Sequence, residues 1–236
     1  MNIVEATGLK KYYRRGVETV RALDGVNLCL MSGELVAMVG PSGSGKTTLM
    51  NLISCLDTPT AGQLKVADCD VTQAVEHELV SVRRDFIGFI FQQFHLIPTL
   101  TATENAELPT LFSRKKFQRK DTIRLLERVG LEGCEHLFPY HLSAGDKQRI
   151  AIARALVNDP KLLIADEPTG KLETAVRDSL LSLFRNLANG GLSIFIATHD
   201  LELAVACDRI LYLQDGVLVS AEESSLFMET VSARYC

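Results

Sequence analysis

The sequence has no tryptophan, only six cysteines and no long run of uncharged apolar residues. Because a membrane-spanning helix needs about 18 or more apolar residues in a row, we expect a soluble chain. The first residues, MNIVE, also lack the basic stretch and apolar segment of a secretory leader. The cysteines are widely spaced without a CxxC pair, so we expect reduced, mostly buried thiols rather than disulfides or a metal site.

A strong charge of one sign is missing as well. The 236 residues carry a formal net charge of −4, whereas a nucleic-acid-binding chain is typically strongly basic. We therefore expect no direct contact with nucleic acid. Hydrophobic residues make up 47% and charged residues 23%, which suits one large folded domain, with or without a subdomain, and excludes a disordered chain.

Short apolar runs predict strands that are buried on both faces, at residues 35–39, 87–91, 162–165 and 193–197. Such strands are typical of a parallel sheet that helices cover on both sides. Residues 17–30 instead mix apolar and polar positions in a way that suits an antiparallel strand pair with one wet face. We predict an α/β fold with a mostly parallel sheet and an N-terminal antiparallel β subdomain.

Strand patterns are absent between residues 97 and 156, where the sequence predicts helices at 103–112, 117–129 and 143–157. This stretch is predicted to be a helical subdomain inserted into the sheet domain. The expected division of the single domain 1–236 is a core at about 1–96 and 157–220, a helical subdomain at about 97–156 and a C-terminal tail at 221–236.

The run GPSGSGKTT at residues 40–48 lies between a predicted buried strand and a predicted helix at 47–56, and it matches the P-loop pattern GxxxxGK[ST]. Glycines let the backbone N–H groups turn toward phosphate oxygens, and the helix N-terminus adds a positive dipole. Lys46 is expected at the β and γ phosphates and the Thr47 hydroxyl at Mg²⁺. The predicted phosphate-binding residues are Gly40, Pro41, Ser42, Gly43, Ser44, Gly45, Lys46, Thr47 and Thr48.

Two carboxylates, Asp166 and Glu167, end the predicted strand at residues 162–165. Ligands of parallel α/β sheets bind at this carboxyl end of the strands. Asp166 is expected to hold the Mg²⁺ shell, and Glu167 is placed to polarise an attacking water. A hydrolase needs such a base, whereas a kinase would use an acceptor substrate, so the pattern favours a hydrolase.

The run LSAGDKQR at residues 142–149 resembles the LSGGQ signature of ABC-type ATPases, which no other P-loop class carries. Further family motifs follow in family order, and the resemblance covers about residues 1–220. It implies the P-loop NTPase fold of ABC ATPases, with a mostly parallel RecA-like sheet. It also implies ATP as the bound nucleotide, Mg²⁺ as cofactor and hydrolysis to ADP and phosphate.

The resemblance assigns roles to single residues. Gln92, within FQQF, looks like the glutamine that contacts Mg²⁺ and the water, and His199, within THD, looks like the histidine at the γ phosphate. Tyr13 lies where the family places an aromatic ring that stacks on adenine, and the neighbouring Tyr12 competes for this role. The implied catalytic residues are Lys46, Gln92, Glu167 and His199. The implied metal ligands are Thr47, Gln92 and Asp166.

The resemblance further implies a homodimer, because the family's signature lies opposite the P-loop of a second subunit. Ser143, Gly145 and Asp146 are then expected to contact the nucleotide of the partner from the N-terminus of a helix. ATP would bind the closed dimer better than the open one, and this difference in affinity drives a conformational change.

Three residues depart from the family pattern. Ala144 replaces a glycine and would be strained if its φ were positive. Asp146 replaces a glutamine and puts a carboxylate near an anionic nucleotide, which weakens closure unless the side chain points to the ribose. Glu173 stands where the family has an aspartate. We expect an active ATPase whose rate these departures can lower.

Residues 87–105 resemble the lipoprotein-release and macrolide-export group of ABC ATPases, with the cell-division ATPases as close relatives. This implies a separate transmembrane permease subunit, a peripheral position at the cytoplasmic face of the inner membrane, and export or mechanical extrusion of a cargo. The alternative is a cell-division ATPase that regulates an extracytoplasmic partner without transport. Residues 94–107 are expected to contain the contact surface for the membrane partner.

Other P-loop proteins fit the sequence less well. DNA-repair ATPases insert a coiled coil or extra domains between P-loop and signature, translation factors carry two cassettes, and small-molecule kinases lack the signature. Only about fifty residues separate Gln92 from Leu142, which leaves no room for such an insertion.

Overall fold

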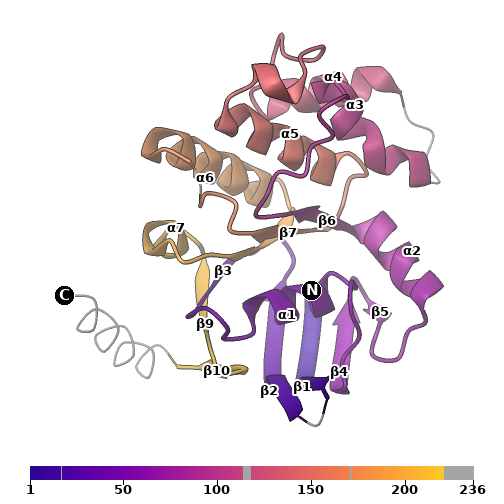
Figure 1. The fold of residues 1–236 in the computed structure, drawn as a ribbon, viewed down its shortest axis with the longest axis vertical. Helices are drawn as coiled ribbons and strands as arrows, with labels where there is room; N and C mark the ends of the chain where they lie inside the picture. Colours follow the sequence, from indigo (N-terminus) through magenta and orange to yellow (C-terminus); the bar gives the residue numbers. More distant parts are fainter. Residues whose placement is uncertain (17, 114–117, 171, 221–236) are drawn as a thin grey trace.

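The computed structural model describes residues 1–16, 18–113, 118–170 and 172–220; the predicted tail 221–236 lies outside this part. The described residues form two β-sheets and the helices that pack on them (Figure 1). The strands are β1 (Asn2–Arg15), β2 (Glu18–Met31), β3 (Leu35–Val39), β4 (Ala61–Val66), β5 (Cys69–Asp70), β6 (Ile87–Ile90), β7 (Leu162–Asp166), β8 (Ser193–Ala197), β9 (Arg209–Gln214) and β10 (Val217–Val219). The helices are α1 (Lys46–Ile53), α2 (Glu76–Phe86), α3 (Ala102–Glu107), η1 (Leu108–Phe112), α4 (Arg119–Arg128), η2 (Pro139–His141), α5 (Ala144–Leu156), α6 (Thr174–Asn189) and α7 (Leu201–Val205), of which η1 and η2 are 3-10 turns.

The larger sheet has six strands in the order β10-β9-β3-β8-β7-β6. All neighbours are parallel except the terminal pair β9 and β10, and every residue of β3 and β8 is buried. The four predicted parallel strands are therefore present, although β6 ends at Ile90, one residue earlier than expected. Ala197 pairs with Met38 on one side and Asp166 on the other, so these strands end level with one another.

The antiparallel sheet differs from the prediction in its strands. Its order is β2-β1-β4-β5, and the stretch expected to hold a strand pair is a single strand, β2. The partner of β2 is β1, for example through the pairs Val4–Leu30 and Tyr13–Val20. The expectation of a strand pair within 17–30 was wrong, because the partner strand is β1. The end of β1 is a run of polar residues, which hides the strand pattern that the buried Val4, Ala6 and Leu9 give to its first part.

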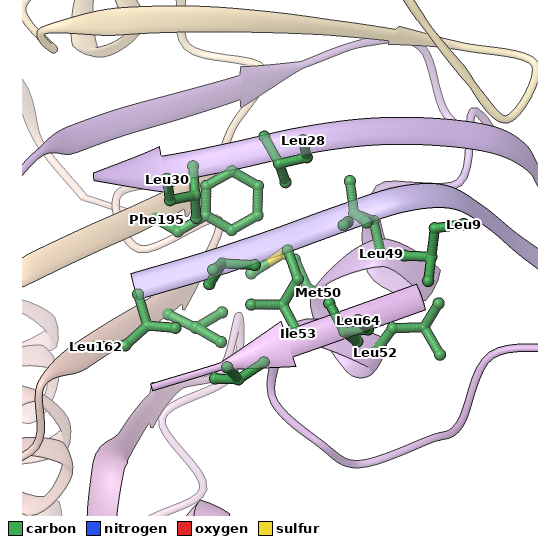
Figure 2. Packing of buried hydrophobic residues seen from close by; sticks show 14 of the residues in the cluster. Leu9, Leu28, Leu30, Leu49, Met50, Leu52, Ile53, Leu64, Leu162 and Phe195 are labelled. Atoms are coloured by element: carbon green, nitrogen blue, oxygen red, sulfur yellow. The ribbon is translucent and has the colours of Figure 1, made fainter. Parts of the chain in front are cut away.

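Helix α1 lies between the two sheets and fills the first hydrophobic core. Its buried side chains Leu49, Met50, Leu52 and Ile53 meet residues of β2 and β4 on one side and Leu162 and Phe195 of the large sheet on the other (Figure 2). Full burial of each such side chain contributes about 1.5–3 kcal/mol. The start of α1 is thereby fixed against the edge of the parallel sheet.

The opposite face of the large sheet is covered by other helices. A second core joins Ile150 and Ile152 of α5 and Phe184 of α6 to residues of β6, β7 and β8. The described residues between β6 and β7 form only helices, turns and loops, which supports the proposed helical subdomain. The predicted helix at 103–112 is split into α3 and the 3-10 turn η1, because Pro109 lies at the start of the turn.

Two features of the composition have structural counterparts. Among the described residues no helix is long and apolar enough to cross a membrane. The five described cysteines are free thiols, but only Cys55 is buried, so the expectation of mostly buried thiols was wrong. Cys29 is exposed because it takes an outward position in the alternating pattern of β2.

Gly88 of β6 lies directly against the backbone of α5, and Gly88→Ala tests this contact. A Cβ at Gly88 would overlap the carbonyl oxygen of Ala155. We expect the free energy of unfolding to fall by about 1–3 kcal/mol, because backbone has to move to admit the methyl group. Urea denaturation followed by circular dichroism measures the change.

Gly170→Ala is the matched control, since a Cβ there would meet its nearest neighbours at 3.7 Å. It should change stability by no more than about 0.5 kcal/mol. Equal stability of Gly88→Ala and the wild type would contradict the close packing of α5 on β6.

Candidate functional site

Four loops that carry predicted site residues leave the large sheet at one edge. β3 runs into the P-loop, β6 ends two residues before Gln92, β7 ends at Asp166 and β8 ends two residues before His199. The four strands are parallel neighbours in the order β3-β8-β7-β6. The structure therefore brings these predicted residues to the carboxyl edge of the sheet, where ligands of α/β proteins bind.

At two positions of the P-loop, the structure leaves room only for glycine. Gly45 precedes α1 with φ 107°, and a Cβ there would overlap the carbonyl oxygen of Ala22. Gly40 leaves no room either, because its Cβ would overlap the carbonyl oxygen of Leu213. The N-terminus of α1 thus approaches the sheet edge closely, with free N–H groups that suit an anion.

The Lys46 ammonium lies inside this loop. Its Nζ donates to the carbonyl oxygens of Gly40 at 2.7 Å and Pro41 at 2.8 Å. Burial lowers the pKa of Lys46, and the negative charges of Glu167 and Asp166 oppose this shift. A lysine ammonium has three N–H donors, so one donor remains for a phosphate oxygen while the other two hold the loop.

Asp166 supplies a hard oxygen ligand at the same edge. Burial and the neighbouring charge of Glu167 raise the pKa of Asp166, whereas Lys46 lowers it. The Thr47 hydroxyl and the Gln92 amide are exposed and add two further oxygen donors. In the described part of the chain, no three His, Cys, Asp or Glu side chains form a complete metal site. The donor set fits Mg²⁺, which is held by few protein oxygens together with phosphate oxygens.

Glu167 and His199 form a pair beside the carboxylate of Asp166. The Nδ1 of His199 lies 2.8 Å from Oε2 of Glu167, and the His199 backbone N–H donates to the same oxygen at 3.3 Å. Glu167 has φ 47°, a left-handed conformation that is strained in a residue with a side chain. The Glu167 side chain is 11% exposed and the His199 side chain 71% exposed, so the acid is enclosed while the ring faces outward.

Tyr12 and Tyr13 point to opposite faces of β1. The Tyr13 hydroxyl donates to Asp57 at 2.9 Å and interacts with Thr48 of the P-loop run. The Tyr12 hydroxyl donates to a different residue, Asp24, at 2.6 Å. Only the Tyr13 side chain therefore lies beside the predicted phosphate-binding residues.

The signature residues lie at the start of α5 and form a capping box. The Ser143 hydroxyl donates to Oδ2 of Asp146 at 2.7 Å, and the Asp146 N–H donates back to Ser143 at 3.1 Å. The Asp146 carboxylate is thus engaged with Ser143. Ala144 is the first helical residue and is not among the residues with positive φ, so its methyl group causes no backbone strain. Gly145 is buried, and a Cβ there would come within 2.8 Å of Val176.

The structure adds residues that the sequence patterns did not indicate. Asp57 holds both Tyr13 and Lys11 through its two carboxylate oxygens. Thr169 follows the two acidic residues and has a buried hydroxyl without a hydrogen-bond partner among the described residues. Arg154 reaches from α5 to the loop after Gln92. Arg154 was detectable, as the one charged residue in the run IAIARAL, whereas Asp57 carried no local signal.

A pocket of about 690 Å³ lies away from these residues. It is lined by Phe86, Lys161 and Leu192, which precede β6, β7 and β8. This is the amino edge of the parallel sheet, opposite the P-loop. None of the predicted site residues lines this pocket, so the candidate site is the carboxyl edge.

A glycine-built phosphate loop between β3 and α1, together with two acids at the end of β7, defines a P-loop nucleoside triphosphatase. The ABC transporter family profile matches residues 23–170. The chain therefore belongs to the ABC transporter family and is an ATP-binding, ATP-hydrolysing cassette of that family.

Similar proteins agree with this assignment. The ABC transporter ATP-binding protein YvrO of Bacillus subtilis is 44% identical over 220 residues, covering 92% of this chain and 96% of that relative. The macrolide export ATP-binding/permease protein MacB of Rhodopirellula baltica is 45% identical over 221 residues, covering 92% of this chain and 32% of that relative. The chain thus spans about a third of the length of this MacB protein.

Solved structures show the same fold. The dimeric structure of MJ0796, a bacterial ABC transporter cassette, is 41% identical with a TM-score of 0.85, covering 92% of this chain and 97% of that chain. MJ0796 has also been solved as a dimer in a post-hydrolysis state bound to ADP and Pi. The predicted ABC ATPase fold is therefore confirmed.

Asp166→Asn tests the electrostatics of the site. A carboxyl whose pKa is raised in the folded chain destabilises the fold once pH exceeds that pKa, and this penalty disappears as pH falls and the group is protonated. We expect Asp166→Asn to raise the unfolding temperature of the nucleotide-free chain at pH 8. The advantage should shrink as pH is lowered toward about 4, near the usual pKa of the aspartyl group.

Differential scanning calorimetry across this pH range measures the effect, and the exposed Asp121→Asn serves as control. A lower unfolding temperature of Asp166→Asn at pH 8 would show that attraction to Lys46 outweighs the burial of Asp166.

Proposed function

We propose that two copies of this chain close around two ATP molecules and thereby drive a conformational change in a separate transmembrane permease. The finer activity we propose is export, or mechanical extrusion of a lipoprotein-type or macrolide-type cargo, at the cytoplasmic face of the inner membrane. The name of the MacB relative, an export ATP-binding/permease protein, supports this assignment. The name of the YvrO relative, an ABC transporter ATP-binding protein, supports the role of an ATP-binding subunit.

The observation that carries the proposal is the position of the two nucleotide-binding elements on opposite faces of one sheet. α1, which begins at the P-loop, packs on one face with the antiparallel sheet, whereas α5, which begins at Ser143, packs on the other (Figure 1). Ser143 is exposed at the start of α5, where it can reach the site of another chain. The dimeric structures of MJ0796 support this arrangement.

Each phosphate-binding group has a proposed role. The backbone N–H groups of the P-loop bind the phosphate oxygens, and Lys46 neutralises the β and γ phosphates. Thr47, Gln92 and Asp166 hold Mg²⁺, which when bound neutralises developing charge on the β and γ phosphates. The Tyr13 ring stacks on adenine. From the partner chain, Ser143 and the Gly145 backbone donate to the γ phosphate, and the Asp146 side chain points to the ribose.

Hydrolysis requires a base, and Glu167 is the proposed one. In the structure one of its carboxylate oxygens lies 2.8 Å from Nδ1 of His199. When the exposed His199 ring donates to the γ phosphate instead, the Glu167 oxygen becomes available to a water molecule. Glu167 then accepts a proton from this water as it attacks the γ phosphate. Loss of the phosphate that joins the two chains reopens the dimer.

The proposed surface for the permease lies at residues 94–107. Asn105 is fully buried, and its amide bonds to the backbone of Ile97, Leu100 and Thr101, which gives this loop a fixed shape. Ile97 presents an apolar side chain that is 40% exposed. A shaped, partly apolar loop next to Gln92 is suited to a protein contact that senses the nucleotide.

The second candidate is a cell-division ATPase that regulates an extracytoplasmic partner without transport. It uses the same ATP-driven closure and differs in the membrane subunit. A neighbouring gene for a four-helix membrane protein with a large external domain supports the group to which both candidates belong. ATP-dependent movement of a cargo by the complex separates export from regulation without transport.

The Tyr13 role predicts a difference between adjacent tyrosines. Tyr13→Ala should raise the KM for ATP by about tenfold, since base stacking on an aromatic ring contributes about 1–3 kcal/mol. Tyr12→Ala, on the opposite face of β1, should leave KM within twofold of the wild type. A phosphate-release assay measures both, and a larger effect of Tyr12→Ala would reverse the assignment.

The Glu167 role predicts a trapped dimer. Glu167→Gln keeps the size of the side chain but cannot accept a proton, so hydrolysis should fall by about 100-fold or more while ATP still closes the dimer. Size-exclusion chromatography in ATP should show this variant as a dimer. Adding Ser143→Ala should return it to a monomer; a Glu167→Gln protein that stays monomeric at high ATP would refute shared binding.

A further inference from the structure

Helix α5 connects two regions that lie far apart in the chain. Ser143 caps its N-terminus, and Arg154 lies in its last turn. A helix of 13 residues is about 20 Å long and moves as a rigid element. Any displacement of Ser143 is therefore transmitted to Arg154.

Arg154 holds the loop that follows Gln92. Its Nη1 donates to the carbonyl oxygen of His95 at 2.7 Å and its Nη2 to that of Phe94 at 2.8 Å. The planar guanidinium suits this bridge, because it presents two N–H donors in a fixed fork. In the described part of the chain Arg154 forms no ion pair with a carboxylate, and burial lowers its pKa. Its interactions are thus directed to the loop backbone.

The strand that leads into this loop also packs on α5. Gly88 of β6 lies so close to α5 that a Cβ would overlap the carbonyl oxygen of Ala155, the residue after Arg154. Phe91 packs edge-on against the ring of His95, with ring centroids 5.3 Å apart. His95 has φ 47°, a strained conformation that needs surrounding contacts to persist. Gln92 lies between these two attachments.

We propose that Arg154 is a positioning residue that ties the Gln92 loop to α5, so that closure of the partner's site through Ser143 also places Gln92 for hydrolysis. This inference rests on the proposed roles of Ser143 and Gln92. Arg154 itself touches neither nucleotide nor water; it acts through the backbone of Phe94 and His95.

A double-mutant cycle tests this positioning role. Arg154→Met keeps the apolar stem of the side chain and removes both hydrogen bonds to the loop. We expect kcat to fall by about tenfold, with the KM for ATP within twofold of the wild type. In a Gln92→Ala background the same substitution should lower kcat by less than twofold, because Arg154 acts through Gln92.

Arg149→Met is the matched control on the same helix. Arg149 donates to the carbonyl of Val129 and to the Ser179 hydroxyl, so it binds α5 to other parts of the fold. Its effect on kcat should be the same with and without Gln92. Arg154→Lys, which keeps the charge but offers a single ammonium, should have a kcat between the wild type and Arg154→Met.

Two results would overturn the proposal. One is an unchanged kcat in both Arg154→Met and Arg154→Lys. The other is a fall in kcat on Arg154→Met that is as large in the Gln92→Ala background as in the wild type. The proposed function is tested separately by ATP-dependent dimerisation of Glu167→Gln. If that dimer forms and the cycle shows no coupling, only the role of Arg154 is refuted; if it does not form, shared nucleotide binding is refuted.

Discussion

The level ends of four parallel strands are the constraint on which the site depends. β3, β8, β7 and β6 are hydrogen-bonded neighbours, and their pairing puts the residues that follow each strand along one edge. Burial on both faces fixes this register, because a shift by one residue would exchange every side chain between the two cores. The packing of the sheet therefore positions the P-loop, the pair of acids, Gln92 and His199. Only the turns that follow the strands are particular to the chemistry of this site.

The two faces of this sheet have different tasks. One face carries α1 and fixes the phosphate loop against the antiparallel sheet and Tyr13. The other carries α5, with Ser143 at its start and Arg154 near its end. In the proposed function a second chain completes this divided site, so ATP gains its additional contacts only when the dimer closes. This proposed difference in affinity between the open and closed states would drive the conformational change in the membrane partner.

The sequence predicted what depends on local patterns. Continuous apolar runs located β3, β6, β7 and β8, and the glycine-lysine pattern located the P-loop, because both need particular residues at fixed spacing. The partner of β2 was missed, since pairing across a sheet is a long-range property that a single strand does not encode. The choice between Tyr12 and Tyr13 also needed the structure, because it depends on which face of β1 meets α1. Arg154 stands out in the sequence as a single charge in an apolar run, but its hydrogen bonds to Phe94 and His95 join residues about sixty positions apart and needed the structure.

The central claim is that Ser143 of one chain faces the P-loop of another when ATP is bound. Disulfide cross-linking measures this directly, since two cysteines link only when their Cα atoms lie within about 7 Å. One chain would carry S42C and the other A144C, both exposed positions, in a Glu167→Gln background with the native cysteines replaced; A144C lies next to Ser143 and leaves its hydroxyl in place. We expect a cross-link between the two chains with ATP and none without nucleotide. A cross-link within a single chain carrying both changes, or none between chains in ATP, would contradict shared binding of the nucleotide.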